Sequence, residues 1–286
     1  MKILTFEDLE LKARWAGHAA FQAAAALIKK HGEIVMLAAV APSQYAMWKE
    51  FLKLLDRDNL TNRIHLFHMD DYPGLPDNDP RSFAVNLRDK FVQNRPFASV
   101  TYINRNAKDP LKEVGRLGKA FADHGSHFHL VTCGHGEDNH MAFNAPPVPD
   151  EDFYACFQRP RDRPFGAMVF RHVELPHASR MQQVHEDTGF ERLADVPTRA
   201  YSVNLWPIID AGVVIDSVQG ATKADAMFKT VYEPITPHNP GSILRIRADR
   251  RPIIGGLQSN TMVFADRDAA SRLDDSHIST VTFEPE

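Results

Sequence analysis

Two adjacent carboxylates, Asp70 and Asp71, follow a short apolar run and precede a Pro-Gly turn in the stretch HMDDYPGLP. Ligands of open α/β sheets gather beyond the carboxyl ends of the strands, so acids in this place are candidates for a binding or proton-transfer site. Aspartate is also common in helix caps and turns. The pattern alone leaves the chemical and the structural interpretation equally open.

A second candidate lies in the loop GHGEDNHMAFN, which follows another apolar run. Asp138 and His140 stand two residues apart in this loop, and its glycines give the backbone freedom. An acid beside an imidazole suits proton transfer on a sugar-like substrate. A purely structural turn is the alternative.

Composition limits the classes of function. The chain has 286 residues, of which 24% are charged, and a formal net charge of -4. Without a basic excess it is not expected to bind nucleic acid or an anionic membrane. The N-terminal stretch has acids where a signal peptide needs an apolar core, and no apolar run approaches the ~20 residues that cross a bilayer. With two cysteines, Cys133 and Cys156, we expect a cytoplasmic protein.

Apolar runs and helical patterns alternate along the chain. This alternation predicts βαβ units, and hence one α/β domain over residues 1–286 with three αβα layers and a Rossmann-like, mostly parallel sheet. The weakly periodic stretch 146–195 is expected to be a lid-like segment or an insertion. The tail 274–286 is an edge strand or a loose end. Helices are predicted over 6–30, 42–55, 82–92 and 110–124, and a further helix begins near Thr222. Strands are predicted over 33–41, 64–69, 100–103 and 127–134. The stretch 200–220 has the pattern of a strand, a helix and a second strand.

Two motifs resemble the glucosamine-6-phosphate deaminase/isomerase family. HMDDYPGLPDNDPRSFAVNLRDKF is similar to a family segment with Met-Asp-Glu-Tyr, Gly-Leu and a serine that begins a helix. CGHGEDNHMAFNAPP is similar to Gly-x-Gly-x-Asp-Gly-His-x-Ala-Phe-Asn-Glu-Pro. Weaker similarity extends over most of the chain from about Glu33. The related 6-phosphogluconolactonases lack the continuation found at Ala142 to Asn144, which favours the deaminase/isomerase branch.

The resemblance implies a role for each matching residue. Asp70 would be the general base that removes the C2 proton, with Asp71 as a supporting neighbour. His140 would open the sugar ring, and Asp138 would accompany it. Tyr72 would line the pocket. The implied reaction is ring opening, proton abstraction at C2, reprotonation at C1 and, in a deaminase, loss of ammonia, without a metal or organic cofactor.

The phosphate-binding part of the family pattern is altered. The family has Gly-Gly-Thr-Pro after the first strand, whereas this chain has Ala39-Val40-Ala41-Pro42. Val40 does not readily adopt the positive φ of a glycine, and Ala41 has no hydroxyl, although Ser43 could substitute. Lys223, in GATKA, matches a phosphate-binding position outright. The remaining residues assigned to substrate binding are Gly136 and Asn144 of the second motif.

Three further departures lie near the predicted site. A phosphate arginine expected near Thr188 is missing, which leaves Arg180 and Arg192 as candidates. Ala145 stands where the family has a glutamate that orients the histidine, so Glu137 or Glu186 would have to replace it. Asn139 replaces a glycine.

These observations leave three functional hypotheses. The first is a divergent isomerase or deaminase acting on an amino sugar or a related aldose, with or without a phosphate. The second is a non-catalytic sugar sensor, which the missing glutamate favours, and the third is a lactonase in which His140 activates water. The expected partner is therefore a small sugar or sugar phosphate; assembly into a homo-oligomer is left open, because family members vary in oligomeric state.

A metal site is not expected. The stretch HLFHMDD places His65 and His68 close to Asp70 and Asp71. On a strand, however, His65 and His68 would point to opposite faces, so they could not easily share one ion.

Overall fold

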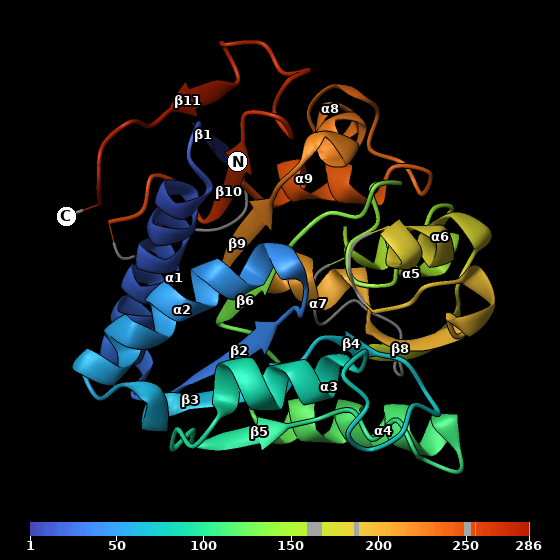
Figure 1. Ribbon diagram of the computed structural model, residues 1–286. Helices are drawn as coiled ribbons and strands as arrows, with labels where there is room; N and C mark the ends of the chain where they lie inside the picture. Colours follow the sequence, from blue (N-terminus) through green and yellow to red (C-terminus); the bar gives the residue numbers. More distant parts are fainter. Residues whose placement is uncertain (159–167, 186–188, 249–252, 255, 286) are drawn as a thin grey trace.

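The computed structural model describes residues 1–158, 168–185, 189–248, 253–254 and 256–285. Its main element is a sheet of eight strands in the order β11-β1-β10-β9-β6-β2-β3-β5, and every neighbouring pair in it is parallel (Figure 1). The strands of this sheet are β1 Lys2–Phe6, β2 Ile34–Ala38, β3 Ile64–His68, β5 Ser99–Thr101, β6 Leu130–Cys133, β9 Val213–Val218, β10 Thr261–Asp266 and β11 Ile278–Thr280.

Helices cover both faces of the sheet, as the alternating pattern predicts. Successive strand residues point to opposite sides. In β2, Ile34 and Met36 pack with α1 and α2, whereas Val35 and Leu37 pack with α4 and α7. The predicted α/β class, with a mostly parallel sheet, is confirmed. The helices are α1 Leu9–His31, α2 Pro42–Arg57, α3 Phe83–Asn86, α4 Pro110–Asp123, α5 Asp150–Ala155, α6 His177–His185, α7 Leu205–Asp210, α8 Ala224–Tyr232 and α9 Leu244–Ala248.

The helices α1 and α2 pack unusually closely. A Cβ atom at Gly17 would lie 2.8 Å from Glu50 Cβ and 3.0 Å from the Met47 carbonyl oxygen, so this position of α1 admits no larger residue without displacement of α2. Small side chains continue along the buried side of α1 at Ala16 and Ala20. The pair lies over one face of the sheet in Figure 1.

A small antiparallel sheet lies outside the main one. It consists of β4 Asp70–Asp71, β8 Arg199–Val203 and β7 Phe170–Glu174, in the order β4-β8-β7. It therefore joins the chain after β3 to the stretch 146–195, which contains α5, β7 and α6. Part of that stretch, 159–167 and 186–188, lies outside the described residues, and the lid-like role stays a prediction.

Several elements were not predicted. The helix predicted over 6–30 is present as α1, but the residues before it, Lys2–Phe6, form a strand between β10 and β11 that the sequence analysis did not predict. The predicted helix over 82–92 consists of α3 followed by a π-helical turn, Leu87–Val92. The tail contains the edge strand β11. In the described part of the chain, no helix combines the length and apolar character needed to cross a bilayer.

Candidate active site

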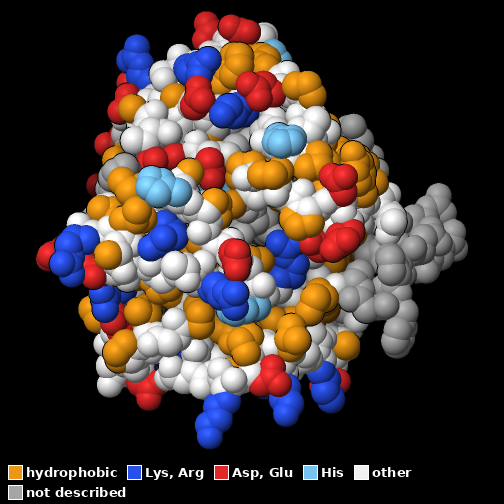
Figure 2. All heavy atoms as spheres, turned by 90° about the vertical axis from the view of Figure 1, so that its right-hand side faces the viewer, with side chains coloured by type: hydrophobic (Ala, Val, Ile, Leu, Met, Phe, Trp, Pro, Cys, Tyr) orange, Lys and Arg blue, Asp and Glu red, His pale blue; other side chains and the backbone are white. Residues whose placement is uncertain are grey.

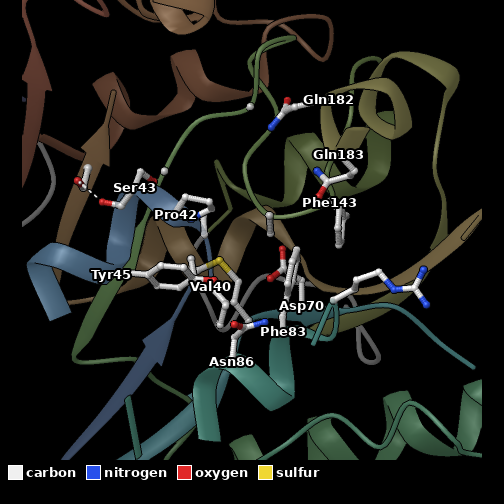
Figure 3. Close-up of a pocket in the computed structure, with 18 of the residues that line it drawn as sticks. Val40, Pro42, Ser43, Tyr45, Asp70, Phe83, Asn86, Phe143, Gln182 and Gln183 are labelled. Atoms are coloured by element: carbon white, nitrogen blue, oxygen red, sulfur yellow. Dashed lines mark hydrogen bonds between the residues drawn. The ribbon is translucent and has the colours of Figure 1, made fainter. Parts of the chain in front are cut away.

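A cavity of about 1090 Å³ opens at the carboxyl ends of the central strands. The segments that follow β2, β3, β6 and β9 all contribute to its walls, as is usual for open parallel sheets. The segment 79–90 and helix α6 complete them (Figure 3). Of the predicted site residues, the cavity brings together Val40, Ala41, Ser43, Asp70, Gly136, His140 and Lys223.

Asp70 and Asp71 have opposite orientations because they are neighbours in the short strand β4. Asp70 lines the cavity. Asp71 is fully buried and accepts hydrogen bonds from the backbone N–H groups of Phe83 and Ala84, both at 3.0 Å, and from the Ser82 hydroxyl at 2.9 Å. Asp71 thus caps the N-terminus of α3, which agrees with its predicted role as a supporting neighbour; the further prediction that it takes part in substrate binding is corrected, because it does not line the cavity.

Asp70 lies in a dry environment. It is 6% exposed, and its Oδ1 atom has no hydrogen-bond partner in the described part of the chain. In Figure 3 it lies near the aromatic rings of Phe83 and Phe143, which also line the cavity. Burial, and then the charge of Asp71, raises the pKa of Asp70 well above its ordinary value. A carboxylate of this kind is suited to taking a proton from a bound molecule.

His140 is held by Asp138. The Nδ1 atom of His140 lies 2.6 Å from Asp138 Oδ1, and the backbone N–H of His140 donates to the same oxygen. Burial opposes ionisation of Asp138, but the His140 imidazole and the hydroxyl of Ser179 in α6 hold the pKa of Asp138 below its ordinary value. Because a carboxylate only accepts hydrogen bonds, Nδ1 carries a proton and Nε2 remains for proton exchange.

Gly136 is required by the position of the His140 ring. A Cβ atom at Gly136 would overlap the imidazole of His140. The Gly136 N–H also donates to the His140 carbonyl oxygen at 2.9 Å, which closes the loop. The glycine therefore lets the backbone approach the ring directly, and the sequence assignment of Gly136 to the site agrees with its place in the cavity wall.

The same loop is anchored to α8 by buried polar groups. Asn139 has a φ of 71°, and its side chain accepts from the Thr230 hydroxyl and donates to Asn239. His135 lies 2.8 Å from Asp216 through Nδ1 and 3.2 Å from Thr230 Oγ1 through Nε2. Asparagine tolerates positive φ better than most residues, so Asn139 can occupy this turn without a glycine.

Comparison with known proteins shows which enzymes this chain is similar to in sequence. No protein-family model matches it. A glucosamine-6-phosphate deaminase of Streptococcus pneumoniae is 28% identical over 213 residues, which cover 74% of this chain and 80% of that protein. This similarity supports the resemblance to the glucosamine-6-phosphate deaminase/isomerase family that the two sequence motifs indicate.

Solved structures support the fold of this family. A monomeric glucosamine-6-phosphate deaminase superposes with a TM-score of 0.76 and 21% identity over 95% of this chain and 100% of that chain. The 6-phosphogluconolactonase of Trypanosoma brucei has a TM-score of 0.68 and 14% identity over 96% of this chain and 98% of that chain. The chain thus has the same fold as these two proteins.

The residues that align with the family's phosphate loop line the cavity. Ala41 precedes the first turn of α2 in an extended conformation, and no side chain caps that end. Val40 does not have a positive φ, so the valine causes no strain there. The Ser43 hydroxyl accepts from Gln44 at 3.1 Å, and Lys223, which is 7% exposed, also lines the cavity. A helix N-terminus and a lysine thus face one cavity.

The two arginine candidates are not in the cavity wall. Arg180 donates to the carbonyl oxygens of Leu193 and Val196, and Arg192 forms an exposed ion pair with Asp195. Arg81, which the sequence analysis did not single out, lines the cavity. It forms two side-chain hydrogen bonds with Asp79, at 2.9 and 2.7 Å. The one feature of the sequence that could have drawn attention to Arg81 is its position directly before Ser82, the serine that begins the predicted helix.

Tyr72 and Asn144 also lie outside the cavity wall. Tyr72 is fully buried, and its ring packs against Phe83, Phe143 and Phe190 with centroid distances of 5.2, 5.2 and 5.5 Å. It supports the aromatic part of the wall from behind. The Asn144 amide donates to the carbonyl oxygens of Met141 and Val203, which ties the loop to β8. Both assignments to substrate contact are therefore corrected to support of the wall.

The missing glutamate has no direct substitute among the candidates. Ala145 lines a different hollow from the one that contains His140. In the described part of the chain, Glu137 makes no hydrogen bond with the His140 ring, and Glu186 lies outside the described residues. The carboxylate that holds the ring is Asp138.

Metal ligands do not gather at the site. His68 is fully buried, and burial lowers its pKa to about 4, whereas His65 bonds with Ser99 and Glu33. In the residues that the structure describes, no group of three His, Cys, Asp or Glu side chains has the geometry of a metal site.

The surface charges are mixed. Figure 2 shows acidic and basic side chains interspersed on one face of the molecule.

Proposed function

We propose that this chain is an isomerase or deaminase of amino sugar phosphates, with His140 and Asp70 as its proton-transfer groups. The observation that supports this most directly is that both side chains line one cavity. Among the residues that the structure describes, none forms a hydrogen bond with Asp70 Oδ1, and His140 is fixed by Asp138. The similarity to a glucosamine-6-phosphate deaminase supports the substrate class.

The reaction begins with ring opening. His140 exchanges a proton between the ring oxygen and the C1 hydroxyl, which gives the open-chain aldehyde. Asp70 then removes the C2 proton; the electron pair of that C–H bond forms the C1–C2 double bond while the C1–O1 π bond breaks and O1 takes a proton, which gives an enolamine. A proton then returns to C1 as the nitrogen lone pair forms a C=N bond at C2 and the nitrogen gives up a proton, which gives a ketimine at C2. Addition of water to the ketimine and departure of ammonia give the ketose phosphate, so that one water is consumed for each ammonia released.

The surroundings of Asp70 suit proton abstraction from carbon. A carboxylate in water is a weak base, and its raised pKa at this buried position brings it closer to the pKa of a useful base. The phosphate would bind between the N-terminus of α2 and Lys223, which face the same cavity.

The test measures ammonia and ketose phosphate formed from glucosamine 6-phosphate and galactosamine 6-phosphate. We expect release of ammonia, and a KM for the phosphorylated sugar that rises by about 10- to 100-fold in Lys223→Met, since a charge-assisted hydrogen bond contributes roughly 1.5–3 kcal/mol. Hydrolysis of 6-phosphogluconolactone without ammonia release would favour a lactonase instead. Binding of sugar without any turnover would favour a sensor.

A further inference from the structure

Helix α6 contacts the loop that carries His140 through two buried side chains. The Ser179 hydroxyl donates to Asp138 Oδ2 at 3.1 Å, and the Glu137 N–H donates to Gln182 Oε1 at 2.7 Å. Ser179 is 1% exposed and Gln182 is 5% exposed. These contacts join residues 41 and 45 positions apart in the chain, so they exist only when α6 is packed against the loop.

The two oxygens of Asp138 have different partners. Oδ1 accepts from the ring and the backbone of His140, and Oδ2 accepts from Ser179. A carboxylate held at one oxygen can still rotate about its Cβ–Cγ bond, whereas one held at both oxygens has a fixed plane. The Ser179 hydrogen bond therefore fixes the direction in which Asp138 presents Oδ1 to the imidazole.

The hydrogen bond between Ser179 and Asp138 supports the histidine of a motif in which this chain lacks the family's glutamate. With Ala145 in place of the glutamate, the His140 ring depends on Asp138 for its orientation. Helix α6 is itself held by Arg180, which donates to the carbonyl oxygens of Leu193 and Val196. The orientation of the imidazole thus depends on a helix remote in sequence.

We infer that Ser179 is a positioning residue for the proton-transfer pair, and that α6 must be docked for His140 to be correctly oriented. Gln182 and Gln183 of the same helix point toward the cavity in Figure 3 and line it. The helix that orients His140 therefore also touches the space where a sugar would bind. A ligand that contacts these amides favours the docked helix, and so favours the oriented imidazole.

The inference rests on the proposed function. One of the two readouts of its test, the NMR signal of His140, can be measured whether or not the protein is a deaminase. The variants are Ser179→Ala, Ser179→Thr, which keeps a hydroxyl, and Ser99→Ala as a matched control. The Ser99 hydroxyl bonds with the His65 imidazole at 2.8 Å, away from the cavity. The first readout is the ¹⁵N-resolved NMR signal of the His140 ring without ligand; the second is the split between kcat and KM for deamination.

We expect Ser179→Ala to shift and broaden the Nδ1–H signal of His140 and to lower kcat by about 10- to 100-fold with a KM change below about threefold, as for other groups that orient a functional histidine. Ser179→Thr and Ser99→Ala should keep both readouts. Should Ser179→Ala not fold, Ser179→Cys replaces it, because the thiol fills the same volume and donates only weakly. An unchanged His140 signal in Ser179→Ala would overturn the inference, even if the wild-type protein turns over no amino sugar phosphate.

Discussion

Asp70 and Asp71 are adjacent in the chain, yet one carboxylate faces the cavity and the other caps the helix α3. The alternation of a strand separates them. The structural acid also influences the chemical one, because the charge of Asp71 adds to burial in raising the pKa of Asp70. The two residues should therefore respond to substitution in opposite ways.

Asp71→Ala should strongly destabilise the fold. It removes the acceptor of the α3 N–H groups and of Ser82, and leaves the buried Arg105, 3.9 Å away, without this carboxylate. Loss of one partner of a buried charged network costs about 3–5 kcal/mol. The free energy of unfolding in urea at pH 7 measures this. A loss below about 1 kcal/mol would contradict the capping role.

Asp70→Asn should instead raise the free energy of unfolding. Between the ordinary pKa of 3.8 and the raised one, folded Asp70 keeps a proton that the unfolded chain releases, so wild-type stability falls as the pH rises through that interval. Asp70→Asn has no titrating group at this position, so its stability should not fall with pH for this reason. We expect its advantage over the wild type to be close to nothing below pH 3.8 and to grow above that pH by up to about 1.4 kcal/mol for each pH unit, until the pH passes the raised pKa.

Urea denaturation of both proteins from pH 3 to pH 8 measures that difference. A constant difference across the range would mean that Asp70 does not titrate in an environment distinct from water.

Gly136→Ala should displace His140, since the added Cβ overlaps the imidazole ring. We expect loss of deaminase activity by about 10²-fold or more, because general acid-base contributions are typically 10²- to 10⁴-fold. Gly115→Ala is the matched control, because it adds a methyl group to α4 with nothing within 4 Å. The control should keep activity and gain about 0.5–1 kcal/mol of stability from helix propensity. Equal activity in the two variants would refute the packing argument.

The buried Lys12 should give the free energy of unfolding a second pH dependence, opposite in sign to that caused by Asp70. Burial lowers the pKa of Lys12 to about 8 from 10.5, against the charges of Asp266 and Asp216, and its ammonium donates to the Val218 carbonyl oxygen. Between these values the unfolded chain binds a proton that the folded one lacks, so stability rises with pH. From pH 7.5 to 10.5 the wild type should gain up to about 3 kcal/mol relative to Lys12→Met. Parallel stability curves for the two proteins would contradict the assignment.

Much of the fold could be predicted from the sequence, because buried parallel strands such as Ile34–Ala38 are continuous apolar runs between helical patterns. Some strands were missed. Lys2–Phe6 is not a continuous apolar run, because it contains Lys2 and Thr5, and Asp70–Asp71 is too brief to show a period. Asp70 and His140 could be found because they follow strands within recognisable motifs. The motif distinguished Asp70 from its supporting neighbour Asp71, but it did not show that Asp71 caps α3 and makes no contact with the cavity.

The remaining site residues depend on packing between distant segments. Arg81 lines the cavity only because the turn before α3 bends over it, and Ser179 reaches Asp138 across 41 positions of the chain. Arg81 stands within the first motif but at a position to which the resemblance gives no role, and Ser179 stands in neither motif. The sequence alone does not show that either side chain reaches the site.

Deuterium incorporation tests the central claim most directly. Glucosamine 6-phosphate and galactosamine 6-phosphate are incubated in deuterium oxide with the wild type or Asp70→Asn, and NMR follows the sugar carbons. We expect the wild type to place solvent deuterium at C2 of the amino sugar or C1 of the ketose, and Asp70→Asn to do so about 10²- to 10⁴-fold more slowly. Absence of deuterium with the wild type, or equal rates in both proteins, would contradict the account.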